Sequence, residues 1–301
     1  MLGLPDGRRL VRGLRALTAV PSRQLRAAKA ARSGPKRRRT ELFLTNASGY
    51  RIFVRTTEPD DGAVRPAVIL VPGRDKDSGV FESVLYPLNA AEVASIGARV
   101  FTFDPTGRGR SWGHDDFCGS EGQDSLRAVL DYVHSRRDVR QDKVGVVSFS
   151  LGLSLAAPVL ASHGDRLRTA FLLDWEGPAN RDAILRSGPI PPAARAALAR
   201  DPEIFWAHRE PLSSMDDLPC PYIRVQARDD HALGARGAKG AVELVQEASR
   251  GRAPETLLND NPGDSSWRPD QIEELRWAPS DPSALNALLL RIIRQRLGLG
   301  A

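Results

Sequence analysis

The stretch that decides the fold is VGVVSFSLG, residues 144–152, an apolar run that ends near Ser150 and leads into a segment with helical character. A strand that breaks at a serine with small residues two positions away on each side is typical of a nucleophile elbow. There the serine hydroxyl is exposed, and the N–H of the next residue, Leu151, is free to bind an oxyanion. The small residues here are Ser148, which departs from the usual glycine, and Gly152. The alternative interpretation is an ordinary strand-turn-helix that contains a serine.

Strand-like and helix-like segments alternate on both sides of this stretch. The sequence therefore predicts an α/β fold with a mostly parallel central sheet flanked by helices, whose ligand site lies at the carboxyl ends of the strands. Residues 177–219, which contain several prolines and short helical pieces, are expected to form a small helical cap. The expected strands lie at 40–46, 50–57, 66–71, 98–103, 144–148, 169–173, 222–226 and 255–258, and the expected helices at 80–96, 125–135, 151–162, 238–249 and 283–297.

Charge is distributed unevenly along the 301 residues. Residues 1–39 contain twelve Arg or Lys and one Asp, which leaves 31 basic and 36 acidic residues, a formal net charge of −5, in 40–301. Two domains follow: a basic N-terminal tail over 1–39, disordered or a short amphipathic helix, and a globular domain over 40–301. The tail could make weak contact with an anionic surface or act as an organelle transit peptide, and the alternative is a solvated tail. Neither a specific nucleic-acid partner nor an oligomeric state is predicted.

The compartment and the cofactors are inferred from residues that the chain lacks. Cys118 and Cys220 give neither a disulfide framework nor a metal-ligand spacing. No apolar stretch reaches the roughly 18 residues of a membrane span, and no signal peptide is recognisable. The glycines at 107 and 109 lack the third glycine of a dinucleotide site. A cytoplasmic protein without metal, nucleotide or other cofactor is expected, with a small molecule as substrate or ligand.

Over residues 40–299 the chain resembles the α/β-hydrolase family. The turn at 72–74, Pro-Gly-Arg, stands where that family usually has His-Gly-x, and it is followed by the glycine-containing turn at 104–111 and by the Ser150 elbow. The segment 205–212 resembles the dienelactone-hydrolase and prolyl-peptidase-like branches. The resemblance is specific for the fold and less specific for the activity.

The resemblance implies a role for individual residues. Ser150 would be the nucleophile, and the backbone N–H groups of Leu151 and Arg74 would form the oxyanion hole. Asp230 lies where the family places its acid, and Asp229 is the close competitor. The alternative is that these two aspartates cap the helix that follows them.

The family's catalytic histidine, which follows the last strand, is absent. No histidine occurs after His231, and the loop at 258–264 offers only asparagines and the weak base Asp260. A serine hydroxyl needs an adjacent base, so another imidazole would have to supply it. The two candidates are His114, on the loop after the 104–111 turn, and His231, beside the predicted acid but two strands away from the elbow.

Three functions remain open from the sequence. The first is a serine hydrolase that acts on a small ester, thioester or amide through Ser150 with a nonstandard or weakened base. The second is a catalytically degenerate member of the fold that binds a ligand or a protein. The third is a lyase or isomerase in which Asp174, Glu176 or Asp230 moves protons.

Overall fold

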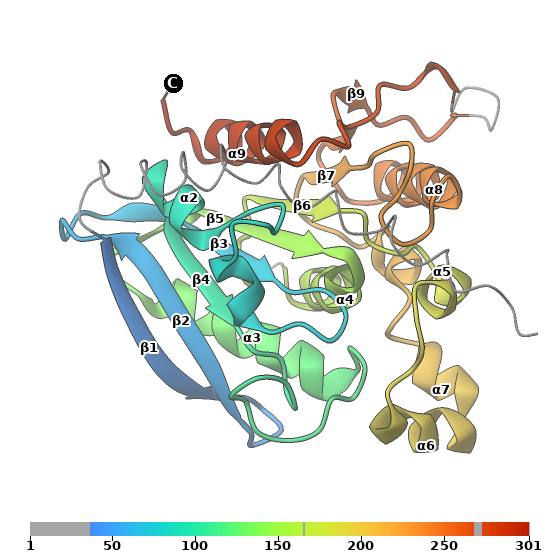
Figure 1. Ribbon diagram of the computed structural model, residues 1–301, viewed down its shortest axis with the longest axis horizontal. Coiled ribbons are helices and arrows are strands. Elements are labelled where there is room, and N and C mark those ends of the chain that lie inside the picture. Colours follow the sequence, from blue (N-terminus) through green and yellow to red (C-terminus); the bar gives the residue numbers. More distant parts are fainter. Residues whose placement is uncertain (1–36, 165, 268–272, 301) are drawn as a thin grey trace, which may run out of the picture. The chain divides into compact units, whose positions relative to one another are not determined.

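A twisted β-sheet runs through the part of the chain that the structure, a computed structural model, describes: residues 37–164, 166–267 and 273–300 (Figure 1). Within these ranges the strand order is β1-β2-β4-β3-β5-β6-β7-β8-β9. Strands β4, β3, β5, β6, β7 and β8 are mutually parallel, whereas β1, β2 and β9 pair antiparallel with their neighbours. The strands are β1 Arg37–Thr45, β2 Arg51–Pro59, β3 Arg65–Val71, β4 Arg99–Phe103, β5 Val139–Phe149, β6 Phe171–Trp175, β7 Tyr222–Val225, β8 Thr256–Leu258 and β9 Asn261–Pro262.

The first strand begins earlier than the sequence suggests. β1 starts at Arg37, so the last three residues of the expected basic tail pair with β2. Arg38 donates to Glu58 at 3.0 Å and Arg39 donates to Glu82 at 2.8 Å, and both acids lie outside the tail. The rest of the expected tail falls on residues 1–36, outside the described residues.

Helices cover both faces of the sheet and bury their apolar sides against it. On one face lie α3 Ser120–Ser135, α4 Leu153–His163 and α8 Arg236–Arg250, and on the other α2 Ala90–Ser95 and α9 Pro282–Leu297. This arrangement confirms the predicted α/β fold with a mostly parallel sheet. None of the described helices is long and apolar enough to cross a membrane.

The helix expected over 80–96 is divided into two shorter elements. A 3₁₀ helix, η1, covers Ser78–Glu82, and α2 begins only at Ala90. Pro87 lies between them, and a proline disfavours helical geometry in the residue before it. Asn89 then starts α2 with a capping box, because its side chain accepts from Ala91 N and the Glu92 carboxylate accepts from Asn89 N.

A cap of short helices is inserted between β6 and β7. It contains α5 Arg181–Arg186, α6 Pro192–Arg200, α7 Pro202–Trp206 and the 3₁₀ helix η3 Pro211–Ser214. Phe205 and Trp206 are buried and pack against the ring of Phe117, which belongs to the loop before α3. The cap is therefore fixed to the main domain by an aromatic cluster.

Candidate active site

Ser150 occupies a strained turn between β5 and α4. Its φ of 51° lies in the left-handed region, which is rare for a residue other than glycine. Gly152 explains why the turn needs a small residue, because a Cβ there would lie 2.8 Å from the Pro72 carbonyl oxygen. These two features are what a nucleophile elbow requires.

Ser148, which stands where the family usually has glycine, forms a side-chain hydrogen bond. The Ser148 hydroxyl donates to Asp174 Oδ1 at 3.3 Å, and both side chains are buried. Asp174 also accepts from Gly177 N at 3.2 Å. The departure from the family pattern thus adds a hydrogen bond beneath the elbow and leaves its backbone in place.

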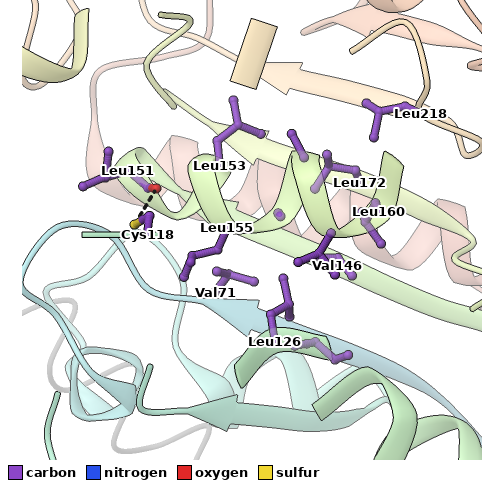
Figure 2. Close-up of a cluster of buried hydrophobic side chains, with 14 of the residues drawn as sticks. Val71, Cys118, Leu126, Val146, Leu151, Leu153, Leu155, Leu160, Leu172 and Leu218 are labelled. Carbon is purple, nitrogen blue, oxygen red and sulfur yellow. Dashed lines mark hydrogen bonds between the residues drawn. The ribbon is translucent and has the colours of Figure 1, made fainter. Parts of the chain in front are cut away.

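The helix after the elbow is held by the hydrophobic core. Figure 2 shows Leu151, Leu153, Leu155 and Leu160 packed among side chains from β3, β5, β6 and α3. The same view shows Cys118, whose thiol contacts the Leu151 carbonyl oxygen at 3.7 Å. Burial raises the pKa of the Cys118 thiol to about 11, so this cysteine stays protonated and is not an alternative nucleophile at neutral pH.

The turn that was expected to supply an oxyanion donor lies beside the serine. A Cβ on Gly73 would be 3.2 Å from the Ser150 Cβ, so the two backbones are in close contact. The N–H groups of Arg74 and Leu151 form no hydrogen bond to another described backbone group. Buried Arg108 fixes the turn by donating to the Gly73 carbonyl oxygen at 3.0 Å. The turn at Gly73 therefore lies beside Ser150, and the role of the Arg74 and Leu151 N–H groups as oxyanion donors stays a prediction.

A cavity of about 480 Å³ opens at the elbow. Ser150 and His231 both line it, although their strands are separated by β6. Its walls come from the loops after β3 and β7, from the last residue of β6, from the segment before α2, from the cap and from the start of α9. The Ser150 hydroxyl forms no hydrogen bond with any described residue. Catalytic contacts of this kind are often long until substrate is bound.

His231 is held in the cavity by Glu176. The Glu176 carboxylate accepts from His231 Nδ1 at 2.7 Å and from the His231 backbone N–H at 3.0 Å, and its second oxygen accepts from Ala227 N at 3.0 Å. The Trp175 ring stacks on the imidazole at 4.5 Å between centroids. A carboxylate on Nδ1 fixes the tautomer and leaves Nε2 as the nitrogen that can accept a proton.

Glu176 reaches this position through an unusual backbone conformation. It directly follows β6, has a φ of 51°, and is almost completely buried. From the sequence alone, Glu176 is expected only as a proton carrier in a lyase or isomerase. An acid after β6 and a histidine after β7 are a signal that could have found the pair, because parallel neighbours end at the same edge.

The predicted acids have other contacts. Asp230 is buried, and its Oδ1 accepts from the backbone N–H groups of Ala232 and Leu233 at 2.8 and 2.9 Å. That oxygen is 3.7 Å from His231 Nδ1, farther than the Glu176 contact. Asp229 is exposed. The alternative that these aspartates cap the next helix is not seen either, because α8 begins after Ala235 without a side-chain cap.

The second candidate base lies elsewhere. His114 is exposed on the loop after the 104–111 turn and is not among the residues that line the cavity. Gly109 of that turn is needed for close packing, because a Cβ there would collide with Asp104. The Asp104 carboxylate accepts from Ser78 N and Arg110 N.

The loop in which the family places its histidine has a structural role here. Asn259 accepts from Gln226 N at 3.0 Å and donates to the carbonyl oxygens of Gln226 and Arg276 at 3.1 and 2.8 Å. It thereby links the ends of β7 and β8. Asp260 is exposed and pairs with Arg291 at 3.3 Å. Neither residue lines the cavity with Ser150.

The side chains around His231 also have the composition of a metal site. Glu176, Asp230 and His231 can offer one ligand atom each within 4.8 Å of one another. Each of the four carboxylate oxygens already accepts an N–H hydrogen bond. A cation would have to compete with all of these donors, so the cluster is built to orient an imidazole.

Comparisons with known proteins agree with the fold described above. A family model described as the alpha/beta hydrolase fold matches residues 66–210. An esterase from Pyrococcus furiosus is similar, with 14% identity, a TM-score of 0.58, and coverage of 88% of this chain and 92% of that chain. An alpha/beta hydrolase from Penicillium sp. sh18 has 13% identity, a TM-score of 0.58 and coverage of 87% and 99%. An acetyl xylan esterase from Paenibacillus sp. R4 has 14% identity, a TM-score of 0.55 and coverage of 91% and 92%. No curated protein matches the sequence.

Proposed function

This chain belongs to the α/β-hydrolase superfamily, and from that premise we propose that it is a serine hydrolase acting on a small ester, thioester or amide. Ser150 is the nucleophile, His231 the general base and Glu176 the acid that orients it. The observation that carries this proposal is the placement of His231 in the cavity of Ser150 with its Nδ1 on Glu176. The triad thus takes its members from the ends of β5, β6 and β7.

The reaction proceeds in two steps, formation of an acyl-enzyme at Ser150 and its hydrolysis. Ser150 Oγ attacks the substrate carbonyl carbon while its proton passes to His231 Nε2, and the N–H groups of Arg74 and Leu151 stabilise the oxyanion. The tetrahedral intermediate collapses, and the leaving alcohol, thiol or amine takes the proton from the imidazolium. Water then gives a proton to Nε2, attacks the acyl-enzyme and releases the acid, and the proton returns to Ser150. Buried Glu176 stabilises the imidazolium in both steps.

The second candidate is a binding module that has lost its chemistry. Two observations favour it. Ser150 and His231 form no hydrogen bond with each other in the described structure, and the loop at 258–264, where the family places its histidine, offers the structural residue Asn259. The two candidates differ in the reactivity of Ser150. An activated serine reacts with a fluorophosphonate, and an inert one does not.

The test is labelling of the full chain with a fluorophosphonate probe, together with hydrolysis of short-chain aryl esters. Wild type should be labelled, Ser150→Ala should not, and His231→Gln should be labelled at least about a hundredfold more slowly. His114→Gln is the matched control, because His114 is an exposed histidine outside the cavity, and it should behave as wild type. An unlabelled wild type would favour the binding module. Loss of labelling in His114→Gln but not in His231→Gln would overturn the assignment of the base.

A further inference from the structure

The described wall of the cavity at Ser150 carries basic side chains and no acidic ones. None of the described residues that line it is acidic, whereas Arg74 and Lys76 both belong to its wall. Residues 40–301 carry a formal net charge of −5, so a lining with two cations and no carboxylate opposes the average of the domain. A cleft lined by one sign of charge attracts ligands of the opposite sign.

Arg74 is held by neutral groups. Its guanidinium donates to the carbonyl oxygens of Pro189 and Ile184 at 2.8 and 2.6 Å and to the Ser187 hydroxyl at 2.8 Å. It also lies over the Phe117 ring, at 4.9 Å from the centroid. Burial lowers the pKa of Arg74, against the opposing effect of nearby acids such as Asp75. No carboxylate of a described residue forms an ion pair with it.

Lys76 is the second cation and is exposed at the same wall. Its ammonium group forms no ion pair with a described residue. A neighbouring cavity of about 390 Å³ between α5 and α8 differs in this respect, because its basic residues share the wall with Asp182 and Glu243. In that cavity Lys239 lies 3.8 Å from Glu243. In the Ser150 cavity, by contrast, neither of the two cations shares the wall with a described acidic residue.

We propose that the substrate of this site is an anionic ester, in which an apolar or aromatic chain fills the cavity and a carboxylate or phosphate group at its far end is recognised by Lys76 and the field of Arg74. The inference rests on the proposed serine hydrolase function and names its substrate class. Tyr86, Trp175 and Leu85 supply the apolar wall, and 480 Å³ is enough for a small acyl chain. Lys76 is therefore a specificity-determining residue.

The experiment compares two p-nitrophenyl esters of the same chain length, one hexanoate and one hexanedioate monoester, with the full-length protein. The measured quantity is the ratio of kcat/KM for the charged ester to that for the uncharged one. The ratio should exceed one, fall about fivefold in Lys76→Gln and fall further in Lys76→Glu, since one unit charge at contact distance in water is worth about 1 kcal/mol. It should also decrease with added salt. Lys239→Gln, which changes an exposed lysine of the other cavity, is the control and should leave the ratio unchanged.

A binding measurement separates this inference from the proposed function. Hexanedioate, hexyl phosphate and hexanamide are titrated into Ser150→Ala and into its Lys76→Gln double variant. Tighter binding of either anion than of hexanamide, weakened by the Lys76 change, supports the inference even if no ester is hydrolysed, and the preferred anion distinguishes a carboxylate from a phosphate. Hydrolysis with equal kcat/KM for the two esters, or a ratio that Lys76→Glu does not lower, overturns it while leaving the hydrolase function intact.

Discussion

Two carboxylates at the end of β6, Asp174 and Glu176, are both buried, but the first pairs with an arginine and the second with a histidine. Asp174 forms an ion pair with fully buried Arg224 and accepts from Tyr222 OH at 3.1 Å. Glu176 holds His231, whose side chain is 36% exposed in the cavity. The first partner is a permanent cation that no substrate reaches, and the second is an imidazole that can gain and lose a proton beside Ser150.

The backbone explains how two residues so close in sequence serve different sites. Asp174 lies in the strand and shares a sheet face with Ser148 and Arg224, its register partners on either side. Alternation would place Glu176 on that same face, but its φ of 51° ends the strand geometry. The carboxylate is thereby directed to the loop after β7. One strained residue thus separates a buried ion pair from the pair that we propose to be catalytic.

Two opposing effects act on the pKa of Arg224 in the buried pair. Burial opposes the charged form of Arg224, but the Asp174 carboxylate outweighs it and raises the pKa of the guanidinium. Arg224 also donates to the Gly177 carbonyl oxygen at 2.7 Å and to Gln226 at 3.1 Å. With its donors satisfied in this way, the pair serves to fix β6 to β7.

The largest effect is expected from Glu176→Gln. It should lower kcat/KM for aryl esters about 10³- to 10⁴-fold, since an amide neither fixes the correct imidazole tautomer nor stabilises the imidazolium. Its free energy of unfolding should fall by about 1–2 kcal/mol, because the amide nitrogen would face the backbone N–H of Ala227 or of His231. A kcat/KM within tenfold of wild type would show that Glu176 is not the acid of the triad.

Arg224→Met is expected to lower the stability of the fold, in contrast to Glu176→Gln, whose main effect is on kcat/KM. Removing one partner of a buried ion pair leaves Asp174 uncompensated, which typically lowers the free energy of unfolding by about 3–5 kcal/mol. Denaturant unfolding measures the loss. Asp174→Asn added to Arg224→Met should recover part of it, because the remaining charge is removed. A single variant as stable as wild type would contradict the role of the pair.

Asp230→Asn separates the acid expected from the sequence from the one seen at His231. Asparagine can still accept from Ala232 and Leu233, but its amide nitrogen faces Gln226, which now donates to Asp230 at 3.1 Å. The free energy of unfolding should fall by about 1–2 kcal/mol. The kcat/KM should change less than about threefold. A loss of activity as large as that of Glu176→Gln would restore Asp230 as the catalytic acid.

Some parts of this molecule can be predicted from the sequence, and others depend on the folded chain. The elbow at Ser150 and the carboxyl edge of the sheet are set by local spacing and by apolar runs, so they can be predicted. The division of residues 80–96 depends on Pro87 and on the cap at Asn89, which outweigh an apolar periodicity that spans both. The Glu176–His231 contact depends on a positive φ and on the adjacency of β6 and β7, which only the folded sheet provides.

The smallest effect is expected at Trp175, which lies between the two sites. Its ring stacks on His231 at 4.5 Å and packs against Phe149 at 5.9 Å, so it restrains the imidazole from the side that Glu176 does not contact. An aromatic pair is worth about 0.5–1.5 kcal/mol beyond its burial. Trp175→Leu should therefore lower kcat/KM about three- to tenfold, whereas Trp175→Phe, which keeps a stacked ring, should stay within about twofold. Steady-state kinetics and urea unfolding of both variants provide the measurement. Equal losses in the two would assign Trp175 to filling the cavity wall and leave Glu176 as the group that orients the base.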